Sequence, residues 1–560
     1  MKKKYSRMMK QLAAGSLLSM AVVQPLQAAA KAPATAAVQE AAASELVPLR
    51  ELAEAIGANV KWDGANKQAI ITRGTAQFIV KIGERTAKLN GSPYTMSSPA
   101  AAANQRMTLP LAALKEAFQA EISWSAAGGL TVSSEDVATA GAHFVYLLQH
   151  GKLAEARAMM NSALQQQMPE ALLGQYWAGN TAAFGLPAAL QSLTAENNNV
   201  HRNAKLGYVT EQSAPFGMIV RFDADGKIDD LFMPLVPDGA YQAPGYDKPE
   251  LYKEEEIVIG EGALSLPATL TLPKNESSKP YPAVVLVHGS GPNDRDEAIG
   301  AYKTFRDIAV GLAGQNIAVL RYEKVTREHS LKTAMNPGFT VMEETVNDAV
   351  AAVQALAKDK RIDAKRIYVL GHSQGGMLVP RIIDNDKNGA VAGAVIMAGP
   401  SGPFEDILIE QNEDALAAAK QAGAATPEME QQVAALKQQI ALLKDPQYSL
   451  TNLPPGFAMA NPAWWFDFRN YYGGEIAKSQ TVPLFILQGD NDFQVKADQL
   501  NGWKKALSAR QDVQYKLYPK LNHGFVTYDQ PSTGQEYALP GNVPAEVIGD
   551  IAAWLKQHGQ

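Results

Sequence analysis

The residues best suited to chemistry are a serine, a histidine and two aspartates that follow predicted strands. Ser373 lies in Gly-His-Ser-Gln-Gly, where the apolar run Ile367–Leu370 gives way to an apolar-periodic segment. A serine hydroxyl is a poor nucleophile unless a base takes its proton. A sharp strand-to-helix turn projects such a hydroxyl clear of a sheet, and glycine neighbours relieve the crowding of that turn. Ser373 is therefore predicted to be a nucleophile.

A base and an acid for this serine follow two later strand-like segments. His523 directly follows the segment 513–522, and Asp490 and Asp492 lie in Gly-Asp-Asn-Asp at the end of the apolar segment 482–490. In open, mostly parallel sheets, chemistry gathers outside the carboxyl ends of the strands. Serine, carboxylate and histidine are therefore expected at one edge of a sheet, where a nucleophile, a base and an orienting acid are able to act together.

The segments that must position these residues alternate between strand and helix from Glu254 onward. Nearly continuous apolar strands are expected where both faces of a parallel sheet are covered. The repeated strand–helix order predicts a doubly wound, mostly parallel sheet. The predicted strands cover 265–273, 281–289, 317–324, 366–373, 389–399, 482–490 and 513–522, and the predicted helices cover 302–316, 341–359, 375–384 and 545–557.

The chain from residue 250 to 560 resembles an α/β-hydrolase in its Gly-His-Ser-Gln-Gly motif and in its order Ser…Asp…His. The resemblance implies that His523 is the general base. It favours Asp492 over Asp490 as the acid, because related sequences place the acid three residues after the strand-ending glycine. It also implies an oxyanion hole built from the backbone N–H groups of Ser290 and Gln374.

This resemblance implies an enzyme that hydrolyses carboxylic esters through an acyl-enzyme, with no metal and no organic cofactor. A serine peptidase of the prolyl-oligopeptidase type shares the fold and the triad, and it is the alternative enzyme. The expected substrate is therefore a small molecule or a peptide. His288 and His372 are interpreted as packing or orienting residues of their motifs, since no acidic partner set accompanies them.

Charged residues follow two of the predicted strands. Asp294, Arg295 and Asp296 are predicted to form an ion-paired loop that fixes the preceding turn, with substrate contact as the alternative. Arg321 and Lys324 are predicted to form a solvated rim, with anion binding as the alternative.

An insertion at 401–480 separates two of the predicted strands, and insertions at this point of the fold form a lid. Its first part is expected to form two helices, and its second part, 456–472, is dense in aromatic residues. Trp464, Trp465 and Phe466 are predicted to bind substrate as an apolar wall that favours a hydrophobic acyl or alcohol group. Packing of the lid onto the body is the equally weighted alternative.

The N-terminal residues have the pattern of an export signal. Residues 1–30 run from a basic segment through a short apolar segment to small residues, which predicts a secretory signal peptide. An Ala/Pro-rich linker is predicted at 31–44. The apolar run is too short to span a bilayer, and no later run approaches membrane length. These patterns predict a secreted or cell-envelope protein without a transmembrane segment.

An internal repeat follows the linker. The segment starting at Val47 matches the segment starting at Leu109, at an offset of 109 − 47 = 62 residues. Each copy is predicted to form a proline-started helix and then a strand that carries Trp62 or Trp124. This α+β module, 45–134, resembles the N-terminal domain of copper amine oxidases, which implies a spacer or attachment role towards the cell wall or envelope. No copper is expected, because the module contains no His and no Cys.

The two tryptophans of the repeat are interpreted as core residues, with a sugar-stacking pair as the alternative. Residues 135–245 predict a second small α+β domain, helical first and then stranded, which resembles the nuclear-transport-factor fold. His143 and His150 lie seven residues apart on its first helix, and no metal site is expected there.

The composition narrows the class of protein further. The net charge of −6 gives no broad basic field, so nucleic-acid binding is not expected. The absence of Cys excludes disulfides and thiol catalysis. An alternative from another class is a cell-envelope binding protein, in which the N-terminal module is the active part and the hydrolase domain is vestigial.

Overall fold

The computed structural model describes residues 46–103, 106–234, 240–275 and 279–558. The predicted signal peptide, 1–30, and the predicted linker, 31–44, lie outside the described residues. The described chain forms two compact units, one within Val23–Leu235 and one within Val236–Gln560. The boundary falls close to the predicted end of the second small domain.

The internal repeat appears as two equivalent strand–helix–strand segments in the first unit. β1 (Leu46–Pro48) precedes α2 (Leu49–Ala55), and β8 (Arg106–Pro110) precedes α3 (Leu111–Phe118). β1 and β8 pair antiparallel with Val47 opposite Leu109, so residues at the same place in the two copies face each other. The remaining strands are β2 (Asn59–Asp63), β3 (Gln68–Arg73), β4 (Ala76–Lys81), β5 (Thr86–Leu89), β6 (Ser92–Thr95), β7 (Ala101–Ala103), β9 (Ile122–Ser125) and β10 (Gly129–Val132).

The two tryptophans of the repeat differ in their surroundings. Trp124 on β9 is partly buried and packs against the core of the module. Trp62 on β2 is 45 % exposed, so the core interpretation is wrong for this residue. β2 is an edge strand that pairs only with β3 in its sheet, and an edge leaves side chains of one face without cover.

Residues after 135 form helices and then a sheet, as predicted. The helices are α4 (Val137–Gln149), α5 (Leu153–Ala158), α6 (Ser162–Gln167) and α7 (Glu170–Phe184), and the antiparallel sheet runs β11 (Pro187–Asn197), β12 (Arg202–Thr210), β13 (Pro215–Phe222) and β14 (Ile228–Phe232). This part packs on the repeat module. Arg73 donates to Phe118 O and to Thr139 Oγ1 of α4, and His143 Nδ1 lies 3.1 Å from Ala55 O. The two predicted small domains thus share one compact unit.

The second unit is built on an eight-stranded sheet in the order β15-β16-β20-β17-β21-β22-β23-β24. The first three strands pair antiparallel, and every pairing from β20 onward is parallel. This confirms the predicted mostly parallel sheet. The strands are β15 (Tyr252–Ile259), β16 (Leu266–Pro273), β17 (Tyr281–Val287), β20 (Ala318–Tyr322), β21 (Ile362–His372), β22 (Val391–Met397), β23 (Leu484–Gly489) and β24 (Val513–Tyr518).

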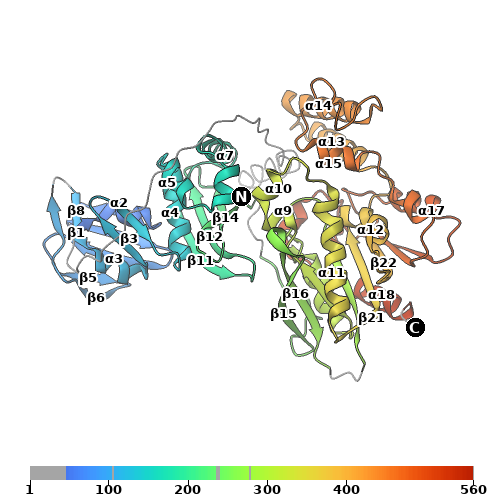
Figure 1. Cartoon of the computed structure of the whole chain (residues 1–560), viewed down its shortest axis with the longest axis horizontal. Helices are drawn as coiled ribbons and strands as arrows, with labels where there is room; N and C mark the ends of the chain where they lie inside the picture. The colour runs from blue at the N-terminus through green and yellow to red at the C-terminus, as the bar shows by residue number, and fades with distance from the viewer. Residues whose placement is uncertain (1–45, 104–105, 235–239, 276–278, 559–560) are drawn as a thin grey trace. The chain divides into compact units, whose positions relative to one another are not determined.

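Helices cover both faces of this sheet. Val285 and Val287 of β17 pack with α11 (Asn347–Lys358), α12 (Gln374–Asn385) and α17 (Asp498–Ala506). Val284 and Leu286 point the other way, towards α8 (Thr304–Ala313) and α18 (Ala545–Gln557). Figure 1 shows α11 and α12 lying along the sheet. Continuous apolar strands such as β17 follow from this double cover.

Short elements connect these layers. They are the 3₁₀ turns η1 (Gly262–Leu264) and η3 (Gln535–Ala538), the hairpin strands β18 (Ala298–Ile299) and β19 (Tyr302–Lys303), the helices α9 (Val325–Glu328) and α10 (Ser330–Ala334), and the π-helical turn η2 (Met342–Val346).

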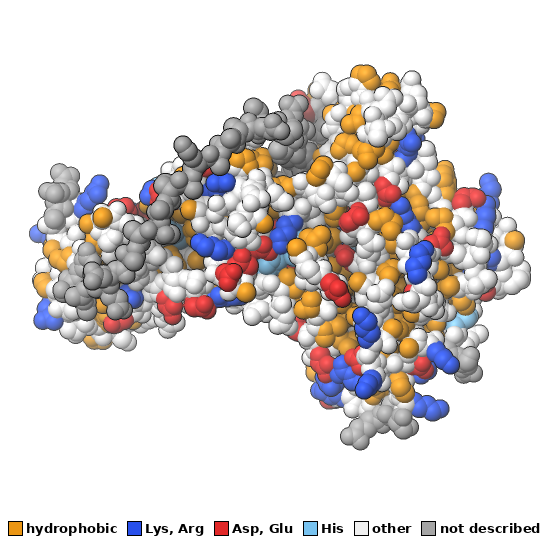
Figure 2. Space-filling model, viewed as in Figure 1, with side chains coloured by type: hydrophobic (Ala, Val, Ile, Leu, Met, Phe, Trp, Pro, Cys, Tyr) orange, Lys and Arg blue, Asp and Glu red, His pale blue; other side chains and the backbone are white. Residues whose placement is uncertain are grey.

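The insertion after β22 forms the two predicted helices, α13 (Phe404–Gln421) and α14 (Pro427–Lys444). The aromatic-rich part that follows contains α15 (Pro462–Phe468) and α16 (Gly473–Ala477). Among the described residues, no helix combines the length and the apolar character that crossing a membrane requires. On the face shown in Figure 2, acidic and basic side chains lie interspersed.

Candidate active site

Ser373 stands at a strained turn between β21 and α12. Its φ of 53° and ψ of −121° lie in a region that non-glycine residues rarely adopt. The neighbouring glycines make the turn possible, as the sequence predicts. A Cβ on Gly371 would lie 2.3 Å from Gly375 O, and a Cβ on Gly375 would lie 2.4 Å from Val287 O.

The turn after β17 packs directly against the serine. A Cβ on Gly289 would lie 3.0 Å from the Cβ of Ser373, a tight contact that would push the two residues apart. The Gly289 N–H donates to Glu297 Oε1 at 2.7 Å and is therefore already used. Ser290 is the next residue on this turn and is exposed, and Gln374 begins α12 on the other side of the serine.

His523 and Asp492 meet on the loops that follow β24 and β23. His523 Nδ1 lies 2.8 Å from Asp492 Oδ2, and both side chains are buried. The other oxygen of Asp492 accepts the backbone N–H groups of Gln494 and Val495, which orients the carboxylate. Asp490 is exposed and accepts the backbone N–H of Lys520 instead.

The histidine beside the nucleophile contacts the loop of His523. The rings of His372 and His523 lie 4.7 Å apart between centroids. His372 Nε2 lies 2.8 Å from His523 O, and His372 Nδ1 lies 2.9 Å from Glu297 Oε2. The structure thus brings β21, with Ser373 at its end, and the His523 loop together at one edge of the sheet.

His288, at the end of β17, packs between aromatic rings. Its ring lies 5.2 Å from that of Phe305 and 5.1 Å from that of Tyr322. Burial lowers the pKa of His288 to about 4, so this ring is neutral around neutral pH. This agrees with the predicted packing role. Among the described residues of the second unit, which we call the catalytic unit, no three His, Asp or Glu side chains lie close enough together to bind one metal ion.

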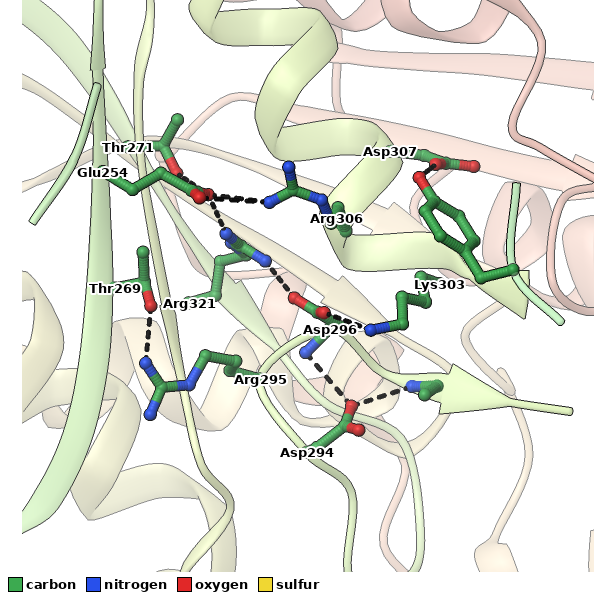
Figure 3. A network of polar contacts seen from close by, with 12 residues as sticks. Glu254, Thr269, Thr271, Asp294, Arg295, Asp296, Lys303, Arg306, Asp307 and Arg321 are labelled. Carbon is green, nitrogen blue, oxygen red and sulfur yellow. Dashed lines mark hydrogen bonds and ion pairs between the residues drawn. The ribbon is translucent and has the colours of Figure 1, made fainter. Parts of the chain in front are cut away.

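The predicted oxyanion turn, residues 288–291, is followed by a loop in which Arg295 and Asp296 are ion-paired, as predicted, whereas Asp294 contacts backbone N–H groups. Asp294 Oδ1 accepts the N–H groups of Asp296 and Ala298. Arg295 contacts Glu256 and Glu323, and Asp296 contacts Lys303 and Arg321. Figure 3 shows Arg321 between Asp296 and Glu254, a residue of β15.

The predicted solvated rim is wrong. Arg321 is 2 % exposed and Lys324 is 1 % exposed. Lys324 Nζ donates to Gly289 O at 2.7 Å and lies 2.8 Å from Glu344 Oε1, so it sits beneath the oxyanion turn. Two long cations at the end of one strand look like a surface rim in sequence, but both are buried and pair with carboxylates from other segments, Arg321 with Asp296 and Glu254 and Lys324 with Glu344.

The three aromatic residues predicted to bind substrate make two kinds of contact: two of them pack within the lid, and the third donates a hydrogen bond. Trp465 is 2 % exposed and packs with Ile440, Leu443 and Met459 inside the lid, so the packing alternative describes it and we do not retain it as a substrate contact. Phe466 is half-buried against Phe457 and under the guanidinium of Arg469. These two residues hold the lid together.

Trp464 differs from its two neighbours. It packs with the lid core and the catalytic core, and its Nε1 donates to Glu344 Oε2. Glu344 lies on the π-helical turn η2 and also pairs with Lys324. Such turns are frequent at functional sites. Trp464 therefore connects the lid to the buried cation beneath the oxyanion turn.

The sequence did not identify Glu297 or Glu344 as site residues. Glu297 is one of three acids within four positions, 294–297, and spacing alone does not show which acid points inward. Glu344 follows another glutamate in a helical pattern. The buried partners of both residues come from distant segments, so only the fold brings them together.

This sheet, the elbow and the paired histidine and aspartate define an α/β-hydrolase, and comparison with known proteins agrees. Residues 284–538 match the alpha/beta hydrolase family, and residues 30–133 match the copper amine oxidase N-terminal domain. Esterase EstD of Thermotoga maritima is 37 % identical over 339 residues, which cover 60 % of this chain and 76 % of the relative. The chain therefore belongs to the α/β-hydrolase family.

Comparison with solved structures gives further matches, all with low sequence identity. An esterase of Pyrococcus furiosus aligns at 16 % identity over 57 % of this chain and 99 % of its own, with a TM-score of 0.35. A proline iminopeptidase of Mycobacterium smegmatis aligns at 18 % identity over 55 % of this chain and 99 % of its own, with a TM-score of 0.34.

Proposed function

We propose that the chain is an exported serine hydrolase that cleaves carboxylic esters through a Ser373–His523–Asp492 triad. One observation carries the proposal: the strained Ser373 lies at the same sheet edge as a histidine that is hydrogen-bonded to a buried aspartate. A relative that is 37 % identical over 339 residues is an esterase. The chain is accordingly a carboxylic ester hydrolase.

In acylation, Ser373 Oγ attacks the ester carbonyl carbon while His523 Nε2 takes the hydroxyl proton. Asp492 holds the opposite ring nitrogen at 2.8 Å and stabilises the imidazolium that forms. The proton then passes to the leaving alcohol as the C–O bond breaks. A water molecule attacks the acyl-enzyme in the second half, with His523 again as base, and releases the carboxylic acid and free Ser373.

The negative oxygen formed in each half needs donors that are already in place. Gln374 directly follows Ser373, and Ser290 directly follows Gly289, which packs against Ser373 and whose own N–H is occupied by Glu297. Preorganised donors of this kind are usually the largest single contribution to catalysis of acyl transfer. Ser290 and Gln374 are therefore the proposed oxyanion hole.

A substrate panel tests the reaction. Purified protein is expected to hydrolyse p-nitrophenyl esters faster than aminoacyl p-nitroanilides, and a fluorophosphonate probe is expected to label Ser373. Faster anilide turnover would indicate the peptidase alternative. Absence of labelling on folded protein would indicate a binding protein with a vestigial hydrolase domain. Ser373→Ala, which removes only the nucleophile, is the matched control.

The proposed export rests on the basic–apolar–small order of residues 1–30. Expression of the full chain in a bacterial host should give a mature form outside the cytoplasm that lacks this segment. Retention of the intact N-terminus in the cytoplasm would reject export without affecting the proposed reaction.

A further inference from the structure

Glu297 is a buried carboxylate that the proposed triad does not use. Its side chain is 1 % exposed, and its backbone has a φ of 49° at the end of the ion-paired loop. One oxygen accepts the Gly289 N–H at 2.7 Å, and the other lies 2.9 Å from His372 Nδ1. A single carboxylate thus contacts both the oxyanion turn and the residue before the nucleophile.

His372 extends this contact to the catalytic base. Its Nε2 lies 2.8 Å from the backbone carbonyl of His523. A carbonyl oxygen only accepts hydrogen bonds, so Nε2 must carry a proton. Nδ1 faces a carboxylate, which also accepts. The contacts therefore favour a ring protonated at both nitrogens, balanced by the charge of Glu297.

The pKa shifts of His372 and Glu297 agree with this arrangement. Burial acts against charge on His372, but the nearby Glu297 carboxylate prevails and raises the pKa of His372. Burial likewise opposes charge on Glu297, but His372 prevails and lowers the pKa of Glu297. The two side chains form a carboxylate–imidazolium pair, which places no net charge beside the ring of His523.

The surrounding charges leave the pair intact. Asp492 faces His372 from the β23 loop, and His288 faces it from the end of β17. Lys324, beyond the end of β20, faces His288. His288 is neutral around neutral pH, since burial lowers its pKa to about 4, and Lys324 is paired with Glu344. Glu297 is thus the direct counter-charge of His372.

The loop that carries Glu297 is fixed from its outer side. Asp296, the preceding residue, contacts the buried Arg321, which also contacts Glu254 of β15. Asp294 accepts two backbone N–H groups of the same loop. Figure 3 shows these contacts converging on the loop. Glu297 therefore projects inward from a rigid support.

We propose that Glu297 and His372 are positioning residues, which hold the oxyanion turn at Gly289 and the His523 loop in a fixed relation on either side of Ser373. The proposal rests on the proposed function of that site. The chain of contacts runs from Gly289 N–H through Glu297 and His372 to His523 O, with heavy-atom distances of 2.7, 2.9 and 2.8 Å. Neither residue touches the reacting atoms.

Two pairs of variants test this. Glu297→Ala breaks both contacts, whereas Glu297→Gln keeps an acceptor for Gly289 and a polar group facing His372. His372→Asn keeps a donor near the Nδ1 position and loses the contact with His523 O, whereas His372→Gln keeps a donor near the Nε2 position. Activity is measured on p-nitrophenyl esters as kcat per fluorophosphonate-labelled site, so misfolded protein is not counted.

Glu297→Ala and His372→Asn are expected to lower kcat by about 10–100-fold, the range typical for loss of a residue that orients an active group. KM should change little, because the substrate contacts remain. The Gln variants should recover most of the lost kcat. Tyr368→Phe is the control, since it removes a buried hydrogen bond of 2.9 Å to Leu555 O from the same strand without touching this chain of contacts.

Wild-type kcat per labelled site in both Glu297→Ala and His372→Asn would overturn the proposal, and so would an equal loss in Tyr368→Phe. If Glu297→Ala does not fold, His372→Asn against His372→Gln decides alone. The proposed function fails separately: it is rejected if Ser373→Ala still hydrolyses esters, whatever the positioning variants do.

Discussion

Asp492 and His523 are joined by a hydrogen bond of 2.8 Å between Oδ2 and Nδ1, although 31 residues separate them along the chain. The carboxylate is itself held by two backbone N–H groups, from Gln494 and Val495. Asp492 contacts Nδ1, so Nε2 is the ring nitrogen of His523 that remains for the proposed role as base. This arrangement also distinguishes Asp492 from Asp490, the other aspartate that the sequence offers as the acid of the triad.

Asp492→Asn is expected to lower kcat by about 10⁴-fold, because an amide stabilises neither the required tautomer nor the imidazolium. Asp490→Asn is the matched control two residues away, and it should retain nearly full turnover. Steady-state hydrolysis of a p-nitrophenyl ester, with thermal unfolding of both variants, provides the comparison. A larger loss in Asp490→Asn would contradict the assignment of the acid.

Gly375→Ala is expected to disrupt the elbow. The added Cβ would lie 2.4 Å from Val287 O and 2.5 Å from His288 O, and neither backbone carbonyl is able to rotate away as a side chain would. The free energy of unfolding should fall by at least about 1–3 kcal/mol, as for other overpacked sites. Urea unfolding and fluorophosphonate labelling give the two measurements.

Gly549→Ala is the control for that substitution. Gly549 lies in α18, and no atom outside its own helix turn lies within 4 Å of the place that an added Cβ would take. Alanine should therefore raise stability by about 0.5–1 kcal/mol through helix propensity alone. Equal effects of the two substitutions would show that the elbow tolerates a side chain.

The elements of the catalytic unit were predictable because their apolar patterns are set by burial. Val284, Val285 and Leu286 have 0 % exposure on a strand that helices cover from both sides, and such a run is recognisable without coordinates. The repeat around Val47 and Leu109 was predictable for a similar reason, since each copy buries the same face. Ser373, His523 and the two candidate aspartates were singled out by their places at the ends of strands, and the resemblance alone favoured Asp492 over Asp490.

The wrong predictions concern the surroundings of single side chains and not the helices and strands that carry them. Whether Trp62 is covered depends on the position of its strand at the edge of a sheet, and a single strand pattern does not contain the strand order. Whether Lys324 meets solvent depends on Glu344, which comes from the π-helical turn before α11. Glu297 was missed because its two partners are fixed only when the turn after β17 and the end of β21 meet.

Arg321→Met is expected to lower the free energy of unfolding by about 1.5–3 kcal/mol, since Asp296 and Glu254 lose their shared buried cation but keep Lys303 and Arg306 as partners. Lys420→Met removes an exposed partner of Glu430 and should cost at most about 1 kcal/mol. Urea unfolding of both variants gives the comparison. Similar costs would mean that the network in Figure 3 contributes no more than a surface pair.

Asp307 should make stability depend on pH in a direction opposite to that of most carboxylates. It is 1 % exposed and accepts hydrogen bonds from Tyr241 Oη at 2.7 Å and from Val543 N at 2.9 Å. Burial raises its pKa from 3.8 to about 6, although these hydrogen bonds act in the other direction. Between about pH 4 and pH 6, Asp307 therefore holds a proton in the folded state that it has released in the unfolded state.

A raised pKa contributes stability below the unfolded value and loses it as pH rises through the folded value. Relative to Asp307→Asn, the wild type should lose about 3 kcal/mol between about pH 4 and pH 7, since each pKa unit corresponds to about 1.4 kcal/mol. Asparagine does not titrate, so any constant cost of the amide cancels in the slope. Urea unfolding of both proteins across this range gives the measurement, and parallel stability curves would show that Asp307 is ionised throughout.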